Sequence, residues 1–170
     1  MKPVISNLTE AVAYVLADVY TAEALLKGAI PDCQAYLTSP SLKAALSQYA
    51  NRADDKRNKV LRVFNYLLRE PDLRSNLIVE AFVDKTKNVL QQASSPEMRD
   101  IMLATCFQSV NYYLLANYRA VARMVRELEL ETAGALLDQV IAWDEQTAEQ
   151  LARIATYELN GRSPEYQTKS

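Results

Sequence analysis

The sequence predicts an all-α protein, arranged as an up-and-down bundle of four long helices and one shorter helix. Three observations lead to this fold class. Apolar residues recur at the spacing of a helix face through five long segments, and no segment shows the alternation of a strand. Cap residues followed by an early Pro or Glu mark where several of these segments begin. Glycine occurs only 3 times in 170 residues, too seldom for a loop-rich all-β fold.

The first two helices are expected at roughly residues 8–30 and 40–68. Asn7 and Glu10 form the sequence pattern of a capping box, and this helix should end or bend near Pro31. A short helical piece at about residues 32–37 follows. Ser39 is a good N-cap for the second helix, and the next residue is a proline, which has no N–H to leave unpaired there.

Three further helices are expected at roughly residues 73–92, 96–127 and 131–159. The fourth opens with the same serine-then-proline signal, at Ser95 and the residue after it. Residues 160–170 are polar and are predicted to form a disordered tail. Residues 1–159 are therefore predicted to form one bundle domain.

The composition excludes several classes of function. The chain has 19 Lys and Arg against 21 Asp and Glu, which argues against a general binder of nucleic acid or of anionic membranes. With no histidine, it has no imidazole base and no imidazole metal ligand. Without a signal-peptide core or a membrane-length apolar run, the protein is expected to be cytoplasmic. Cys33 and Cys106 form no CxxC pair, so we expect two buried thiols, with a disulfide left open.

Two carboxylates lie on apolar helix faces, where a lone charge is costly. Glu23 falls about 20° from the first helix's stripe residue Val12, and Asp144 about 20° from Leu137 on the fifth helix. Lys56 and Arg57 flank the stripe of the second helix, and Arg52 lies one turn before Lys56. The favoured interpretation is an internal salt-bridge network of these five charged residues. The alternatives are a metal site in the bundle core and carboxylates at a wet helix edge.

Aromatic residues supply the candidates for an interface. Tyr112 points nearly opposite the apolar stripe of the fourth helix, and Tyr113 lies at its edge. Trp143 lies beside the stripe of the fifth helix. Tyr and Trp combine a large area with a polar tip, so these residues could anchor a partner, although partly covered rings on a helix surface would look the same.

Several short strings resemble the bacterial YciE/YciF-like ferritin-like family, in order and over about residues 8–155. The strings are DVYTAE at 18–23, TSPSLK at 38–43, SPEMRD at 95–100, QSVNYY at 108–113, and LL at 136–137 followed by Asp144.

The resemblance implies a ferritin-like fold, in which carboxylate and histidine positions could hold two metal ions. Glu23, Glu80 and Asp144 match family carboxylates. The other ligand positions do not match: Tyr49 stands at a family histidine, Arg52 at a nearby glutamate, Asn111-Tyr112-Tyr113-Leu114 at the family's E-H-Y-E string and Ala148 at an aspartate. The resemblance therefore implies a divergent member that has lost most of its metal ligands.

The expected function is non-catalytic. We predict a bundle without a cofactor that acts through self-association, as a homodimer, or through a protein partner, in a setting that the family suggests is stress. The first alternative is a carboxylate-only site for Fe or Mn on Glu23, Glu80 and Asp144. A cavity for a small molecule, lined by Tyr49, Phe107 and Leu114, is a further alternative. Hydrolase chemistry ranks lowest, because no nucleophile–base pair is visible.

Overall fold

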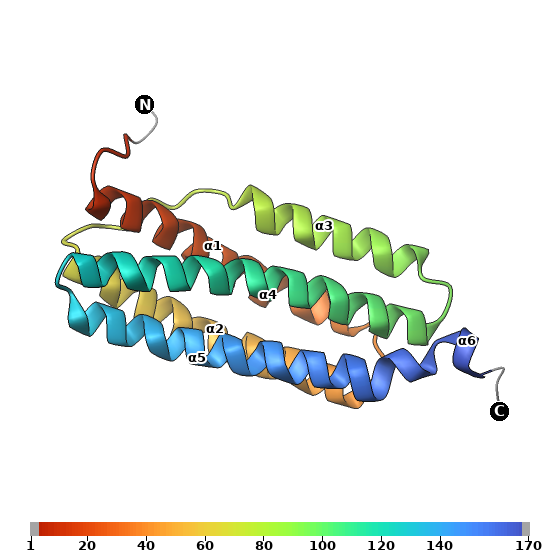
Figure 1. Ribbon diagram of the computed structural model, residues 1–170. Coiled ribbons are helices and arrows are strands. Elements are labelled where there is room, and N and C mark those ends of the chain that lie inside the picture. Colours follow the sequence, from red (N-terminus) through yellow and green to blue (C-terminus); the bar gives the residue numbers. More distant parts are fainter. Residues whose placement is uncertain (1–3, 168–170) are drawn as a thin grey trace.

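Five helices account for most of the computed structural model, which describes residues 4–167 (Figure 1). They are α1 (Leu8–Gln34), α2 (Pro40–Tyr66), α3 (Leu77–Gln92), α4 (Pro96–Glu127) and α5 (Glu131–Ile154). This confirms the prediction of four long helices and one shorter one. None of the helices in the described part of the chain is both long and apolar enough to cross a membrane.

The four long helices surround one core. α1 packs against α2 and α4, and α5 packs against the same two helices from the opposite corner. The shorter helix α3 carries the chain back along the outside of α1 and α4, so α2 and α4 run in the same direction (Figure 1). Each neighbouring pair of long helices is consequently antiparallel.

The helix starts follow the cap signals of the sequence. Asn7 Oδ1 accepts a hydrogen bond from Glu10 N at 2.9 Å, and the hydroxyls of Ser39 and Ser95 cap α2 and α4 in the same way. The third helix begins at Leu77, four residues later than expected, because Asn76 is its cap. Asn76 Nδ2 also donates to Asp18 O at 2.9 Å, which holds this start against α1.

Other expected boundaries also differ from the structure. α1 continues through Pro31 to Gln34, because a proline in the last turn removes only one backbone hydrogen bond. The separate helical piece expected at about residues 32–37 is therefore wrong, since residues 32–34 belong to α1. Residues 160–167, predicted to belong to a disordered tail, form a 3-10 turn at Asn160–Arg162 and a short helix α6 at Pro164–Gln167. A π-helical turn at Ala155–Leu159 joins α5 to them. Residues 168–170 of the predicted tail and 1–3 of the predicted domain lie outside the described residues.

A buried aspartate ties the α1–α2 connection to α4. Asp100, in the first turns of α4, accepts hydrogen bonds from Thr38 N at 2.9 Å, Thr38 Oγ1 at 2.7 Å and Ser39 N at 2.9 Å. Because Ser39 caps α2, this single carboxylate fixes how three long helices meet at one end of the bundle.

Candidate functional site

Three charged side chains meet in the middle of the bundle. α1 supplies Glu23, α2 supplies Lys56 and α5 supplies Asp144. Lys56 Nζ lies 2.8 Å from Glu23 Oε1 and 2.6 Å from Asp144 Oδ1, and each of these side chains is at most 1 % exposed. Glu23 and Asp144, which the sequence placed on apolar helix faces, therefore meet around Lys56 in one ionic centre in the core.

Two tyrosines complete the surroundings of Glu23. Tyr49 of α2 donates its hydroxyl hydrogen bond to Oε2 at 2.9 Å, and Tyr118 of α4 donates to Oε1 at 2.8 Å. The Lys56 ammonium also lies 4.1 Å from the ring centroid of Tyr49. With three donors on its two oxygens, Glu23 is well solvated by protein groups although water cannot reach it.

Asp144 has much poorer surroundings. Apart from the approach of Lys56, neither of its carboxyl oxygens receives an aligned hydrogen bond. The neighbouring Asn111 uses its Nδ2 to donate to the backbone oxygen of Asp144 at 3.0 Å, and its own Oδ1 has no hydrogen-bond donor. Burial raises the pKa of Asp144 from 3.8 to about 7; the Lys56 ammonium opposes this rise and the negative charge of Glu23 adds to it.

The pKa shifts of the neighbouring groups keep Lys56 charged and the two phenols neutral. Burial lowers the pKa of Lys56, but the charges of Glu23 and Asp144 outweigh it, and the net pKa is raised. Burial and the charge of Glu23 raise the pKa of Tyr49 and Tyr118 well above 10, so both phenols keep their protons. Near neutral pH the charged ammonium of Lys56 thus faces a carboxyl group, that of Asp144, which is half protonated.

The structure does not bring Arg52 and Arg57 into this ionic centre, where the sequence placed them. Arg52 Nη1 donates to Gln146 Oε1 at 3.0 Å, although its charge still lowers the pKa of Asp144. The Arg57 guanidinium stacks 4.3 Å from the ring centroid of Tyr20. Both lie at the edges of the α2 stripe, where long side chains extend toward the surface, whereas Lys56 points inward.

The third predicted carboxylate, Glu80, also lies elsewhere. It is half-buried in the first turn of α3, which packs outside the four long helices. Within residues 4–167, no group of three or more His, Cys, Asp or Glu side chains is placed to hold a metal ion. A two-metal centre does not fit these residues, because an ammonium already lies between the two core carboxylates.

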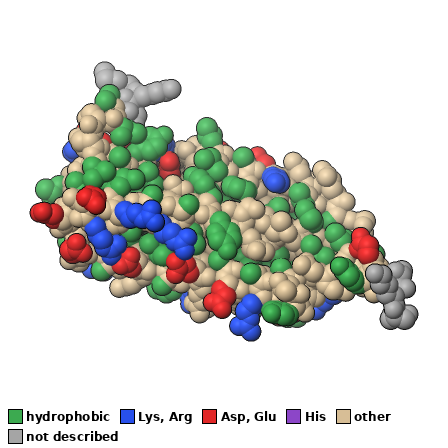
Figure 2. Space-filling model, in the orientation of Figure 1, with side chains coloured by type: hydrophobic (Ala, Val, Ile, Leu, Met, Phe, Trp, Pro, Cys, Tyr) green, Lys and Arg blue, Asp and Glu red, His purple; other side chains and the backbone are tan. Residues whose placement is uncertain are grey.

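The interface candidates differ in exposure. Tyr112 is 54 % exposed, whereas Tyr113 is half-buried with its ring 6.4 Å from that of Phe82. Half-buried Trp143 has the Arg52 guanidinium 5.6 Å and Lys59 Nζ 5.3 Å from its ring. Acidic and basic side chains are intermingled where α4 leads into α5, on the face that Figure 2 shows. This end of the visible face therefore carries no patch of a single charge sign.

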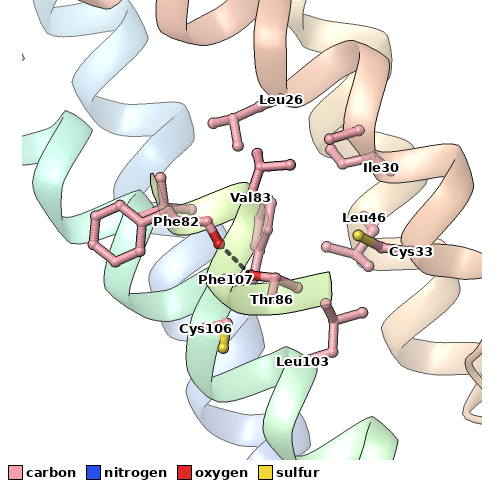
Figure 3. A pocket seen from close by; sticks show the side chains of 12 residues that line it. Leu26, Ile30, Cys33, Leu46, Phe82, Val83, Thr86, Leu103, Cys106 and Phe107 are labelled. Carbon is pink, nitrogen blue, oxygen red and sulfur yellow. Dashed lines mark hydrogen bonds between the residues drawn. The ribbon is translucent and has the colours of Figure 1, made fainter. Parts of the chain in front are cut away.

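The apolar cavity lies away from the ionic centre, between α3 and the core (Figure 3). Its volume is about 30 Å³, enough for a water molecule or two and too small for an organic ligand. Of the residues expected to line a cavity, only Phe107 does so; Tyr49 and Leu114 are packed tightly in the core. Cys33 and Cys106 both border the cavity as free thiols, which leaves no disulfide between them.

Sequence reasoning missed the roles of Tyr49, Tyr118 and Asn111. A signal existed for Tyr49, which lies seven residues before Lys56 and therefore on the same face of α2. Tyr118 and Asn111 likewise lie seven residues apart on α4. Only the packing of the helices shows that both faces meet Glu23 and Asp144.

Comparison with known proteins places the chain in a family. The model of the family described as a domain of unknown function, DUF892, matches residues 7–163. Protein YciF of Escherichia coli strain K12 is 21 % identical over 154 residues, which span 88 % of this chain and 91 % of that protein.

Two solved structures share the fold. YcfI from Rhodopseudomonas palustris superposes with a TM-score of 0.84 at 16 % identity, over 89 % of this chain and 97 % of that one. The crystal structure of the E. coli stress protein YciF gives a TM-score of 0.80 at 20 % identity, over 89 % and 96 %. At these identities the likeness establishes the helical bundle.

Proposed function

This chain belongs to the DUF892 family, and we propose that it is a non-catalytic, ferritin-like bundle in which Lys56 takes the place of metal. One observation supports this proposal above all others. The Lys56 ammonium lies within 2.8 Å of both core carboxylates, Glu23 and Asp144. The cation that these buried groups need is therefore part of the chain itself.

The charges explain why a metal would bind poorly. A pair of divalent ions in a helical bundle is held by several carboxylates, usually with imidazoles. Here the centre has two carboxyl groups, one of which keeps a proton for much of the time near neutral pH. An incoming divalent ion would have to displace that proton and repel the ammonium of Lys56.

Metal content tests the first half of the proposal. We expect untagged protein from cells grown with added iron and manganese to carry far less than one equivalent of either metal by plasma mass spectrometry. Adding millimolar Mn²⁺ should leave the Tm unchanged. One or two equivalents in the wild type would contradict the proposal and favour a carboxylate site for Fe or Mn, and substitution of Glu23, Glu80 and Asp144 would then identify its ligands.

The second half of the proposal is that the surface carries the function. Tyr112 offers a largely exposed ring, and Trp143 lies beneath two cations on the α2–α5 side. Such rings are enriched where proteins associate, because they bury a large area and keep one polar contact. We propose that they anchor a second copy of this chain or a protein partner, with Tyr113 as a third, half-buried candidate.

Sedimentation equilibrium tests this surface role. We expect a concentration-dependent dimer that Tyr112→Ser or Trp143→Ala weakens, whereas Tyr157→Ser, at an even more exposed ring, leaves it unchanged. A wild-type protein that stays monomeric and captures no partner by cross-linking in cells would contradict the proposal.

The biological setting is proposed from the relative alone. The similar E. coli protein is described as a stress protein, and we propose a stress-linked role for this chain as well. Deletion of its gene should impair survival of osmotic or oxidative stress and leave unstressed growth unchanged. Equal survival of both strains under every stress tried would contradict it.

A further inference from the structure

The ionic centre also holds an amine and a carboxyl group in the arrangement that precedes amide formation. Lys56 Nζ lies 2.6 Å from Asp144 Oδ1. The carboxyl carbon that the amine would attack is bonded directly to this oxygen. The two side chains are 1 % and 0 % exposed, and they come from α2 and α5, which pack directly against each other. Reacting groups held in contact and in a fixed orientation gain a large rate advantage over the same groups free in solution.

We propose that Lys56 and Asp144 join through an intramolecular isopeptide bond, with Glu23 as the group that moves the proton. This modification goes beyond the proposed function and would leave the centre equally closed to a metal.

Asp144 is the better electrophile of the two carboxyl groups. Apart from the contact with Lys56, its oxygens receive no aligned hydrogen bond, and burial favours its protonated form, in which the hydroxyl can leave as water. Glu23 accepts hydrogen bonds from Tyr49, Tyr118 and Lys56, which hold its oxygens in place beside the amine as the proton acceptor. Its Oε1 lies 2.8 Å from Nζ, within reach of the proton that must leave.

The atoms and charges balance without any external reagent. Glu23 takes a proton from the Lys56 ammonium, and the freed lone pair of Nζ attacks Asp144 Cγ. The Nζ–Cγ bond forms and a Cγ–O bond breaks, and the departing hydroxyl takes up a proton relayed by Glu23. Of the three ammonium protons, one stays on the amide, one leaves in water and one ends on Glu23, so the centre is neutral before and after.

The surroundings favour the condensed product. The core admits little water, so hydrolysis of the amide back to the free side chains is disfavoured. The neutral amide also replaces a buried ammonium that is costly to desolvate. The ring of Tyr49, 4.1 Å from Nζ, limits the movement of the amine.

Intact mass under denaturing conditions is the first test. The full-length protein, kept folded at neutral pH, should be lighter than its sequence mass by one water molecule. Glu23→Gln keeps a hydrogen-bonding side chain but cannot act as a base, and Lys56→Met lacks the amine; both should show the full mass. Folding of the variants is checked by circular dichroism. A wild-type protein at its full mass overturns the proposal, and so does a water-deficient Lys56→Met.

Tryptic mapping then locates the bond. An amide at Lys56 blocks cleavage after it, so a branched peptide should join residues 53–57 to residues 127–153. Loss of water without this branched peptide would indicate dehydration within one segment and overturn the proposal. A branch to the peptide that contains Glu23 would overturn the assignment to Asp144.

Discussion

At the level of single residues, Asp144 should give the protein a distinctive pH dependence. Its pKa is about 7 in the folded chain, against 3.8 for the ordinary group. Between these two values the folded state holds the proton more tightly than the unfolded state does. In chains without the Lys56–Asp144 bond, the free energy of unfolding should therefore fall as pH rises from about 4 to 7, by up to about 1.4 kcal/mol per pH unit.

Urea unfolding of wild-type chains at their full mass, which lack the bond, checks the prediction across this pH range, with Asp144→Asn as the matched variant. The asparagine keeps the shape but has no proton to lose, so its stability relative to the wild type should improve steadily toward pH 7. A difference that stays constant across the range would show that Asp144 does not titrate in this way.

Substitution of Lys56 should lower the free energy of unfolding more than substitution of any other lysine or arginine in the chain. Compared with wild-type chains without the Lys56–Asp144 bond, Lys56→Met keeps the length of the side chain but leaves the Glu23 carboxylate buried without its cation. We expect a loss of about 3–5 kcal/mol in the free energy of unfolding. Lys59→Met, a half-buried lysine one turn further along α2, is the control and should change little. Adding Glu23→Gln to Lys56→Met should restore part of the loss; no recovery would mean that lost packing, rather than the unpaired charge, causes it.

At the level of the helices, the hydrogen bonds of Asp100 predict how much the link between α4 and the α1–α2 connection contributes to stability. Asp100→Ala removes three hydrogen bonds from Thr38 and Ser39, and the N–H of buried Ser39 and that of Thr38 both lose their carboxylate partner. We expect a loss of about 3 kcal/mol or more, measured by urea denaturation. Asp84→Ala, an exposed aspartate on α3, should cost little. Equal effects of the two substitutions would mean that the α1–α2 connection does not depend on Asp100.

α3 should open before the rest of the bundle. It contacts α1 and α4 from outside, and it covers the cavity that Cys33 and Cys106 border. Burial raises the pKa of the Cys33 thiol, so it should react slowly while α3 is in place. Thiol labelling should therefore depend less steeply on urea than global unfolding does, as expected for a local opening. Labelling with the full urea dependence would show that α3 and the four long helices unfold together.

At the level of the whole molecule, the sequence predicted the helices better than the centre they enclose. The starts of α1, α2 and α4 follow local cap rules, so Asn7, Ser39 and Ser95 could be identified from their neighbours in the chain. The ionic centre depends on four helices at once. Stripe positions indicated that Glu23 and Asp144 face inward, but only packing decides that one ammonium fits between them. The helix periodicity could not show that Arg52 and Arg57 reach the surface.

The bundle domain should end where burial ends. Leu159, in the π-helical turn after α5, is 0 % exposed, whereas residues 160–167 include no buried side chain. A chain that stops after residue 159 should therefore keep the wild-type Tm. One that stops after residue 154 loses Leu159 and should lose about 2–3 kcal/mol of apolar burial, which calorimetry would record as a lower Tm. If both truncations lowered the Tm equally, residues 160–170 would belong to the folded domain and the predicted boundary at 159 would be wrong.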